Sequence, residues 1–241
     1  MKKVMIIEDV EFKDTPLNPV STIDELLKSQ IDEGNLFHMK KKRIIYSEGK
    51  SAAAIFYILK GKVKTSKWNE DGKELITGLY KEGDFIGFHA LMEGGRYRET
   101  AEVIEEADLV SISRNDLTFI FQYNPTFLLN IINILTGNIA DQQEQMLRMA
   151  YSSLRKKVGE ALLITYQKYN PSKNIEFSLN ISRCNLAALA GVAKESLIRT
   201  LSDLRDERII NIQDGKIIIV DHHKLERIIY SDDIRSANSK D

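Results

Sequence analysis

The stretch that decides the fold reads ISRCNLAALAGVAKESLIRTL, from Ile181 to Leu201. Ser182 predicts the N-cap of a helix over residues 183–190, because its hydroxyl can accept a bond from a free backbone N–H. Gly191 then ends that helix, and a second helix is expected from Lys194 to about Arg208, with leucines inward at helical spacing. Helix, tight glycine turn and helix together predict a helix-turn-helix.

The flanking residues extend this motif into a winged domain. A strand-like run at 175–179 precedes it, and residues 209–220 predict two strands joined at Asp214-Gly215. Asp-Gly readily adopts the positive φ of a tight hairpin, which is the geometry of a wing. An amphipathic helix is expected at 153–169, before a loop of turn formers. We therefore place a winged helix-turn-helix at 152–230 and a C-terminal tail at 231–241.

The N-terminal half has a different pattern. Short β-prone runs lie at 43–46, 54–59, 75–77, 85–86, 101–104 and 109–112. Glycines 49, 61, 72 and 83 recur every eleven or twelve residues, a spacing typical of short strands in a sandwich or barrel. The region from about 36 to 115 is therefore expected to be all-β.

Between these halves, apolar residues recur at steps of three and four, which predicts one long helix over residues 124–151. Its narrow apolar seam consists of Leu128, Ile131, Ile132, Leu135, Ile139, Gln142, Met146 and Met149. A long helix with such a seam usually packs against a copy of itself, so we expect a homodimer, with Gln142 suited to fixing the register. The alternative is a helix that lies on its own β-domain.

Composition and charge narrow the class of protein. The hydrophobic content of 43% is ordinary for a globular chain, and no apolar run approaches the roughly 20 residues of a membrane span. We expect a cytoplasmic protein with no membrane partner, since the N-terminus lacks the apolar region of a signal peptide. A single cysteine, Cys184, excludes an internal disulfide and cannot alone hold an iron–sulfur cluster or structural zinc. We expect neither a metal nor a cofactor.

The charge is unevenly distributed along the chain. Residues 1–150 carry 19 Lys and Arg against 23 Asp and Glu, whereas residues 151–230 carry 13 against 9. The C-terminal excess of positive charge favours a face that binds nucleic acid.

Three groups of residues resemble the CRP/FNR family of bacterial transcription regulators. They are 55–63 (IFYILKGKV), 80–87 (YKEGDFIG) with 98–101 (RETA), and the helix-turn-helix stretch quoted above. The resemblance covers roughly residues 30–228 and implies an α+β protein with three parts. These are a sensory β-roll of the double-stranded β-helix (jelly-roll) type at 21–123, the dimerisation helix, and the winged domain. Residues 1–20 form an N-terminal extension, expected to be an added strand or a flexible arm.

The resemblance also implies double-stranded DNA as a partner, and RNA polymerase if the protein activates transcription. Base-reading positions would be Lys194, Glu195, Ser196 and Arg199. Glu195 can accept a bond from a cytosine amino group, and Arg199 can donate two bonds to guanine. The alternative for these two is a surface ion pair four residues apart. Ser182 and Arg183 are suited to phosphate contacts.

In the sensory half the resemblance implies an effector pocket formed by Gly87, Phe88, His89, Arg98, Glu99 and Thr100. Members that bind cyclic AMP hold the ribose with a Glu, where Phe88 stands here, and the phosphate with Arg followed by Ser or Thr. Taking Arg98 as that arginine puts Glu99 beside the phosphate, where the two negative charges repel. We therefore expect an unidentified small-molecule effector that is neither cyclic AMP nor cyclic GMP.

Other functions stay open at this stage. A haem- or gas-sensing regulator would use His89 as an iron ligand, and a module that regulates a partner protein would need no DNA. An enzyme of the cupin type needs several clustered histidines inside the barrel, whereas this half offers only His38 and His89. We therefore expect no catalytic activity.

Overall fold

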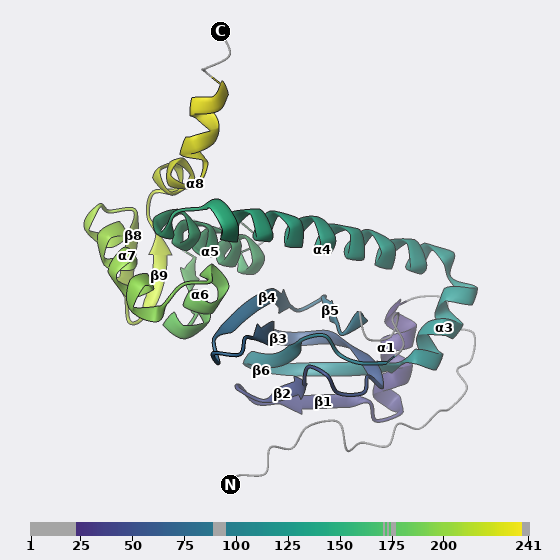
Figure 1. Cartoon of the computed structure of the whole chain (residues 1–241). Coiled ribbons are helices and arrows are strands. Elements are labelled where there is room, and N and C mark those ends of the chain that lie inside the picture. The colour runs from purple at the N-terminus through teal and green to yellow at the C-terminus, as the bar shows by residue number, and fades with distance from the viewer. Residues whose placement is uncertain (1–22, 89–94, 171, 173, 175–176, 238–241) are drawn as a thin grey trace. The chain divides into compact units, whose positions relative to one another are not determined.

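The computed structural model describes residues 23–88, 95–170, 172, 174 and 177–237 (Figure 1). They divide into two compact units, one formed by residues up to 67 together with 77–141, the other by 68–76 together with the residues from 142 onward. Among the described residues, no helix is long and apolar enough to cross a membrane. The N-terminal extension and His89 lie outside the described residues.

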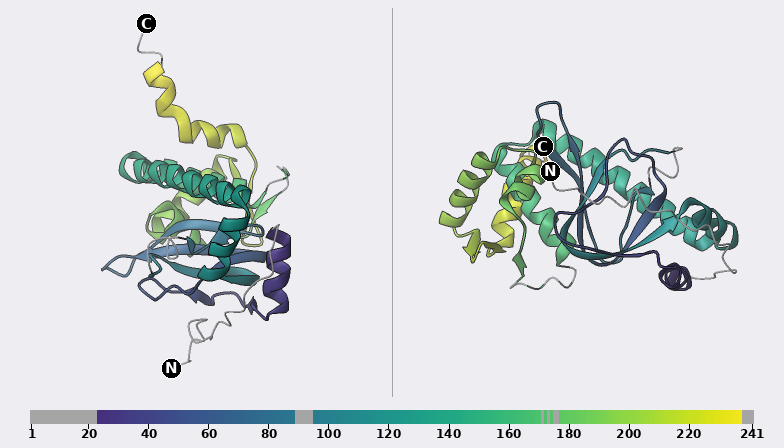
Figure 2. Two further views of the ribbon diagram at one scale, coloured as in Figure 1. Left: turned by 90° about the vertical axis from the view of Figure 1, so that its right-hand side faces the viewer. Right: turned by 90° about the horizontal axis from the view of Figure 1, so that it is seen from below.

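The first unit is built on one sheet of strands β1 to β6 (Figure 2). Their bounds are β1 Leu36–Met39, β2 Ile44–Tyr46, β3 Ala54–Trp68, β4 Glu74–Lys81, β5 Phe85–Ile86 and β6 Thr100–Ser113. In the sheet order β1-β6-β3-β4, β2 also pairs with β6 and β5 with β3. The strands expected from the sequence are present, and they carry the buried apolar core of this unit.

Strands β3 and β6 differ from the prediction in length. The expected runs 101–104 and 109–112 form one strand, because β6 pairs with β3 from Ala54↔Ser113 to Ser66↔Thr100. Irregular register between Ile58 and Val63 absorbs the polar residues that separate the two runs. Gly61 is required there, since its φ is 97° and a Cβ would lie 2.3 Å from the Glu106 carbonyl oxygen.

Two helices that the sequence did not predict flank the all-β region of residues 36–115, namely α1 (Ile23–Asp32) and α3 (Arg114–Tyr123). Leu26 of α1 and Leu117 and Ile120 of α3 pack into a second apolar cluster, which covers a face that the sheet alone would expose. Helix α3 begins with a capping box, in which Ser113 and Asp116 bond each other's backbone N–H. That Ser-x-x-Asp signal is visible in the sequence.

Helix α4 (Pro125–Tyr151) is the predicted long helix, and α5 (Leu154–Tyr169) follows after a short break capped by Ser153. Lys157 of α5 donates to the Met149 carbonyl at 2.7 Å, which satisfies an acceptor in the last turn of α4. Glu160 of α5 is 8% exposed, with Arg148 of α4 at 3.9 Å. Burial raises the pKa of Glu160 above its ordinary value of 4.5, against the opposing charge of Arg148.

We expect Glu160→Gln to remove a pH-dependent loss of stability. When a carboxyl has a raised pKa in the folded state, the unfolded chain releases its proton first as pH rises. Stability is therefore highest below the ordinary pKa and declines as pH rises towards the folded pKa. Urea midpoints measured from pH 4.5 upward should decline through this window more steeply in the native protein than in Glu160→Gln. Parallel curves for the two proteins would contradict this account.

The second unit contains the predicted winged domain. Its elements are β7 Ser178–Leu179, α6 Arg183–Ala190, α7 Lys194–Asp206, β8 Ile210–Gln213, β9 Lys216–Ile219 and α8 His222–Ala237. The sheet order is β7-β9-β8, and Asp214 and Gly215 adopt positive φ at the tip of the wing. Helix α8 differs from the prediction, because it continues past residue 230, where we had placed the start of a tail.

Candidate nucleic-acid interface and effector site

The turn between α6 and α7 has the geometry that the sequence predicts. The Ser182 hydroxyl accepts a bond from the Asn185 N–H at 3.1 Å and caps α6. Gly191 ends α6 at φ 64° and ψ 37°, and its N–H donates to the Ala187 carbonyl. This left-handed conformation favours glycine, so the direction in which α7 leaves the turn is fixed locally.

Helix α7 presents one face to the core and the other to solvent. Its buried residues are Leu197, Thr200, Leu201 and Leu204. Of the predicted base-reading residues, Lys194, Glu195 and Arg199 are exposed, and Ser196 is half-buried. Within the described chain, Glu195 and Arg199 do not form the surface ion pair that was the alternative. Both side chains are therefore available to a ligand.

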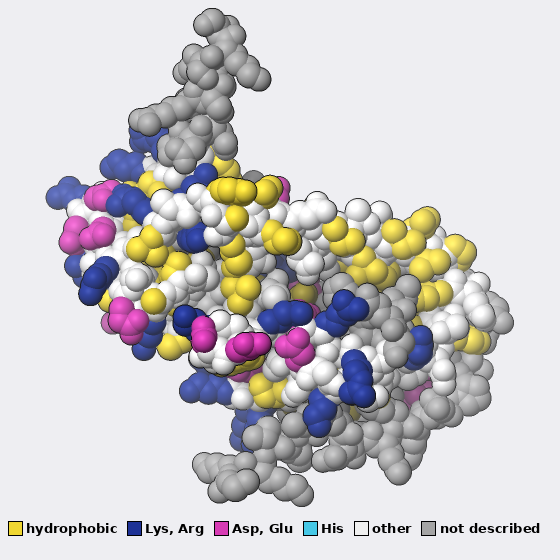
Figure 3. All heavy atoms as spheres, viewed as in Figure 1, with side chains coloured by type: hydrophobic (Ala, Val, Ile, Leu, Met, Phe, Trp, Pro, Cys, Tyr) yellow, Lys and Arg dark blue, Asp and Glu magenta, His cyan; other side chains and the backbone are white. Residues whose placement is uncertain are grey.

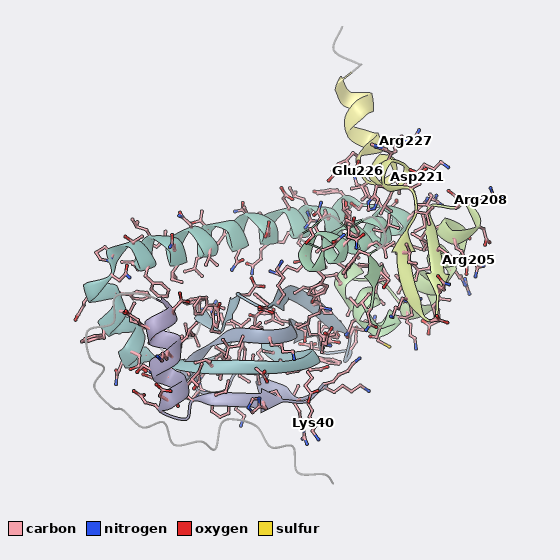
Figure 4. The ribbon with its side chains drawn as sticks, turned by 180° about the vertical axis from the view of Figure 1, so that it is seen from behind. Lys40, Arg205, Arg208, Asp221, Glu226 and Arg227 are labelled. Atoms are coloured by element: carbon pink, nitrogen blue, oxygen red, sulfur yellow. The ribbon has the colours of Figure 1, made fainter. Side chains whose placement is uncertain are left out.

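Two residues on this surface were missed by the sequence analysis. Ile198 is 46% exposed and lies between Glu195 and Arg199. An apolar side chain facing solvent at this position does not stabilise the domain by itself. An apolar group at such a place can contact a thymine methyl. Arg208 is exposed just after α7, and Figure 4 shows Arg205 and Arg208 projecting from this end of the domain. Such side chains suit phosphate contacts.

The predicted phosphate-binding residues lie at the start of α6. Ser182 is exposed, and Arg183 is half-buried. Desolvation lowers the pKa of Arg183, and no acid among the described residues offsets this effect. A guanidinium stays protonated even so, and a partly desolvated, unpaired one gains more than an exposed one from an arriving phosphate.

Within the winged domain, a charged pair links α5 to the end of α7. The Arg155 guanidinium donates to both carboxylate oxygens of Glu207, one of them at 2.7 Å. The hydrogen bond raises the pKa of Arg155 and lowers that of Glu207. Because Glu207 follows α7 directly, this two-pronged pair fixes the end of α7 on α5.

The predicted seam of α4 divides between two faces. Ile131 is 3% exposed and Leu135 packs beside it in the unit's own apolar cluster. Leu128 and Met149 are half-buried, whereas Ile132, Ile139, Gln142 and Met146 are exposed. Figure 3 shows hydrophobic side chains following α4 along the outside. We call the exposed set Leu129, Ile132, Ile139, Met146 and Leu147 the α4 stripe.

Inside the sheet of the first unit, polar side chains from several strands meet. The Thr77 hydroxyl of β4 donates to Glu99 at 2.7 Å and lies 2.9 Å from the Thr65 hydroxyl of β3. Burial, and then the nearby charge of Glu99, raise the pKa of both Tyr46 and Tyr80. We call Tyr46, Thr65, Thr77, Tyr80 and Glu99 the Glu99 cluster.

Two family models match these two units. A cyclic nucleotide-binding domain matches residues 36–124, and a Crp-like helix-turn-helix domain matches residues 156–228. Together they cover about two thirds of the chain. The chain belongs to the CRP/FNR family of transcription regulators. Its members combine the two domains found here, and this chain is accordingly a transcription regulator with a DNA-binding helix-turn-helix.

Individual relatives are distant. The chain is similar to the cAMP-activated global transcriptional regulator CRP of Pasteurella multocida, at 24% identity over 83% of this chain and 96% of that protein. Among solved structures, FixK2 from Bradyrhizobium japonicum has a TM-score of 0.71 at 20% identity, covering 80% of this chain and 96% of that one. The c-di-GMP responsive regulator CLP of Xanthomonas campestris has a TM-score of 0.67 at 20% identity, covering 80% and 98%. These structures share the fold.

The predicted effector residues Arg98 and Glu99 do not point in the directions that the resemblance to the CRP/FNR family implies. Arg98 is exposed, and Glu99 is the side chain that turns inward to Thr77. The burial alternates here, since Tyr97 is 5% exposed, so Tyr97 and Glu99 share one side and Arg98 takes the other. A carboxylate therefore occupies the inward position that we had assigned to a phosphate-binding arginine.

The remaining pocket residues support this picture. Phe88 is buried in the apolar cluster of the first unit. Gly87 lies beside the Tyr46 and Tyr97 rings, since a Cβ there would come within 3.5 Å of both. Thr100 accepts a bond from the Glu48 N–H at 3.1 Å. Of the predicted pocket residues that the structure describes, only Glu99 belongs to the Glu99 cluster.

Proposed function

We propose that the protein is a homodimeric, sequence-specific transcription regulator that binds a two-fold-symmetric site in double-stranded DNA. The exposed face of α7 carries this proposal, because Lys194, Glu195 and Arg199 stand unburied on a helix that a helix-turn-helix delivers to the major groove. Two such helices enter successive major grooves when their half-sites lie about 34 Å apart. We assign Ser182 and Arg183 to phosphates of the same groove.

The α4 stripe supports the homodimer. Ile132, Ile139 and Met146 are spaced by seven residues, which is the repeat of a two-stranded coiled coil. An exposed apolar stripe of this length needs a partner, and a second copy offers the same stripe. We further propose that the dimer works in the cytoplasm without catalytic activity, and that it contacts RNA polymerase if it activates transcription.

Selection from random double-stranded DNA tests the proposal. Purified protein should enrich an inverted repeat, and light scattering of the same sample should give a dimer. Enrichment without symmetry would contradict the dimeric mode of binding, and no enrichment at all would favour a module that regulates a partner protein.

Ile198→Ala should weaken binding only where a thymine faces α7. The substitution removes three carbon atoms, and one buried CH₂ contributes about 0.8 kcal/mol, or roughly fourfold in affinity. Fluorescence anisotropy on the selected site and on versions with single T·A to C·G changes would locate the thymine. Equal losses on all of these sites would mean that Ile198 does not contact a base.

A further inference from the structure

The Tyr46 hydroxyl is a buried polar group whose hydrogen-bonding capacity the described residues do not satisfy. Tyr46 is 1% exposed, and its ring stacks on Tyr97 with centroids 3.9 Å apart. Among the described residues its hydroxyl has no hydrogen-bond partner. Leaving such a group unpaired costs free energy, so a buried hydroxyl without a partner calls for a ligand or another functional reason.

Glu99 supplies unused acceptors in the same place. Within the described chain its one hydrogen bond is the 2.7 Å bond from Thr77, whereas a carboxylate offers about four acceptor positions. No Lys, Arg or His in the described part of the chain forms an ion pair with Glu99. Among the described residues, the half-buried carboxylate therefore has no cation to balance it.

The surrounding side chains fix this geometry. Thr77 is bonded on one side to Glu99 and on the other to Thr65. The Tyr80 hydroxyl lies over Gly78, the neighbour of Thr77, since a Cβ at Gly78 would come within 2.6 Å of it. Strands β3 and β4 thus hold hydroxyl groups around the carboxylate, and the rigid sheet keeps them there.

We propose that the β-roll binds a small organic cation, with an ammonium, amidinium or guanidinium group, whose N–H donors bond to Glu99 and to the Tyr46 hydroxyl. An anionic effector is repelled by Glu99, and a half-buried carboxylate that no cation of the described chain balances gains from a charged donor. This inference rests on the proposed function and names the class of effector for the same β-roll.

Three small molecules that share a benzene ring but differ in charge test this proposal. Benzamidine is cationic, benzamide is neutral and benzoate is anionic, so shape and apolar area are nearly constant. In calorimetric titrations of the full-length protein, benzamidine should bind in the millimolar range or tighter, and benzoate and cyclic AMP should not bind. Equal binding of benzamide and benzamidine would overturn the proposal, as would micromolar binding of cyclic AMP or no binding of benzamidine.

Two conservative variants locate the site. Glu99→Gln keeps an acceptor for Thr77 but removes the charge, and it should weaken benzamidine about tenfold or more. Glu106→Gln changes an exposed Glu on β6 and is the matched control. Tyr46→Phe should weaken benzamidine as well while the free protein melts no earlier, because the removed hydroxyl has no partner among the described residues to lose. Benzamidine binding that neither variant weakens would place the cation elsewhere and overturn the assignment.

The DNA-binding assay separates this inference from the proposed function. Enrichment of an inverted repeat by a protein that does not bind benzamidine refutes the cation site alone. Benzamidine binding that depends on Glu99, in a protein that enriches no DNA, refutes the proposed regulator and leaves the cation site standing.

Discussion

Ile139→Asp should turn the dimer into monomers of 27.5 kDa. Ile139 is 54% exposed in the single chain and lies at the middle of the α4 stripe. In a parallel pair of α4 helices, two introduced carboxylates would face each other across an apolar seam, where neither is hydrated or paired. Affinity for the full inverted repeat should fall at least about a hundredfold, since the second half-site is no longer bound intramolecularly.

Light scattering gives the mass, and anisotropy on full and half sites gives the affinity. Asn133→Asp is the matched control, because it puts the same charge on the same helix at an exposed polar position outside the α4 stripe. Leu135→Asp would be a poorer test, since Leu135 packs on the unit's own core and its loss would disturb folding. A dimer that persists in Ile139→Asp, with an unchanged melting temperature, would exclude the α4 stripe as the interface.

The winged domain could be predicted closely because its signals are local. Ser182 caps α6, Gly191 adopts a left-handed conformation, and Asp214-Gly215 forms the hairpin of the wing. Each is decided by residues within a few positions, which a sequence displays directly. Helices α1 and α3 were missed because they are short. Their apolar residues are explained by packing on the sheet that they cover, which a sequence does not display.

The α4 seam shows why periodicity alone falls short. A spacing of three and four residues identifies an apolar face, but two such faces side by side give the same spacing as one broad face. In this helix Ile131 belongs to the intramolecular face and Ile132 to the exposed one. The alternative of a helix that lies on its own β-domain therefore describes one face of α4, and the exposed face remains the predicted dimer interface.

The effector site could not be predicted from the motif, because one position decides it. If the match of residues 98–101 to the family motif is shifted by one residue, Glu99 takes the place of Arg98 as the residue whose side chain points inward. A ligand then meets a negative charge in place of a positive one. Side chains of extended backbone alternate between faces, so the pairing of the strands selects which residue points inward. Tyr46 and Thr77 joined the site only in three dimensions, from strands far apart in the sequence.

Arg199→Ala should abolish the preference for one base pair in each half-site. Arg199 is exposed in the N-terminal half of α7, and within the described chain no acid holds its guanidinium. It can donate two bonds to O6 and N7 of a guanine, a pairing that contributes about 1–3 kcal/mol of discrimination, or roughly tenfold to a hundredfold. Because a dimer makes this contact twice, the loss on the full site should approach the square of the loss on a half-site.

Competition binding with all four base pairs at each position of the selected site measures the effect. Arg205→Ala is the control, since Arg205 is exposed in the last turn of α7, away from the end that enters the groove, and forms an ion pair with Asp206 at 3.0 Å. That variant should lose affinity slightly and equally on every sequence, with a shallower salt dependence if Arg205 contacts phosphate. If Arg199→Ala behaved in this same uniform way, Arg199 would be a phosphate contact, and Glu195 with Lys194 would be left to read the site.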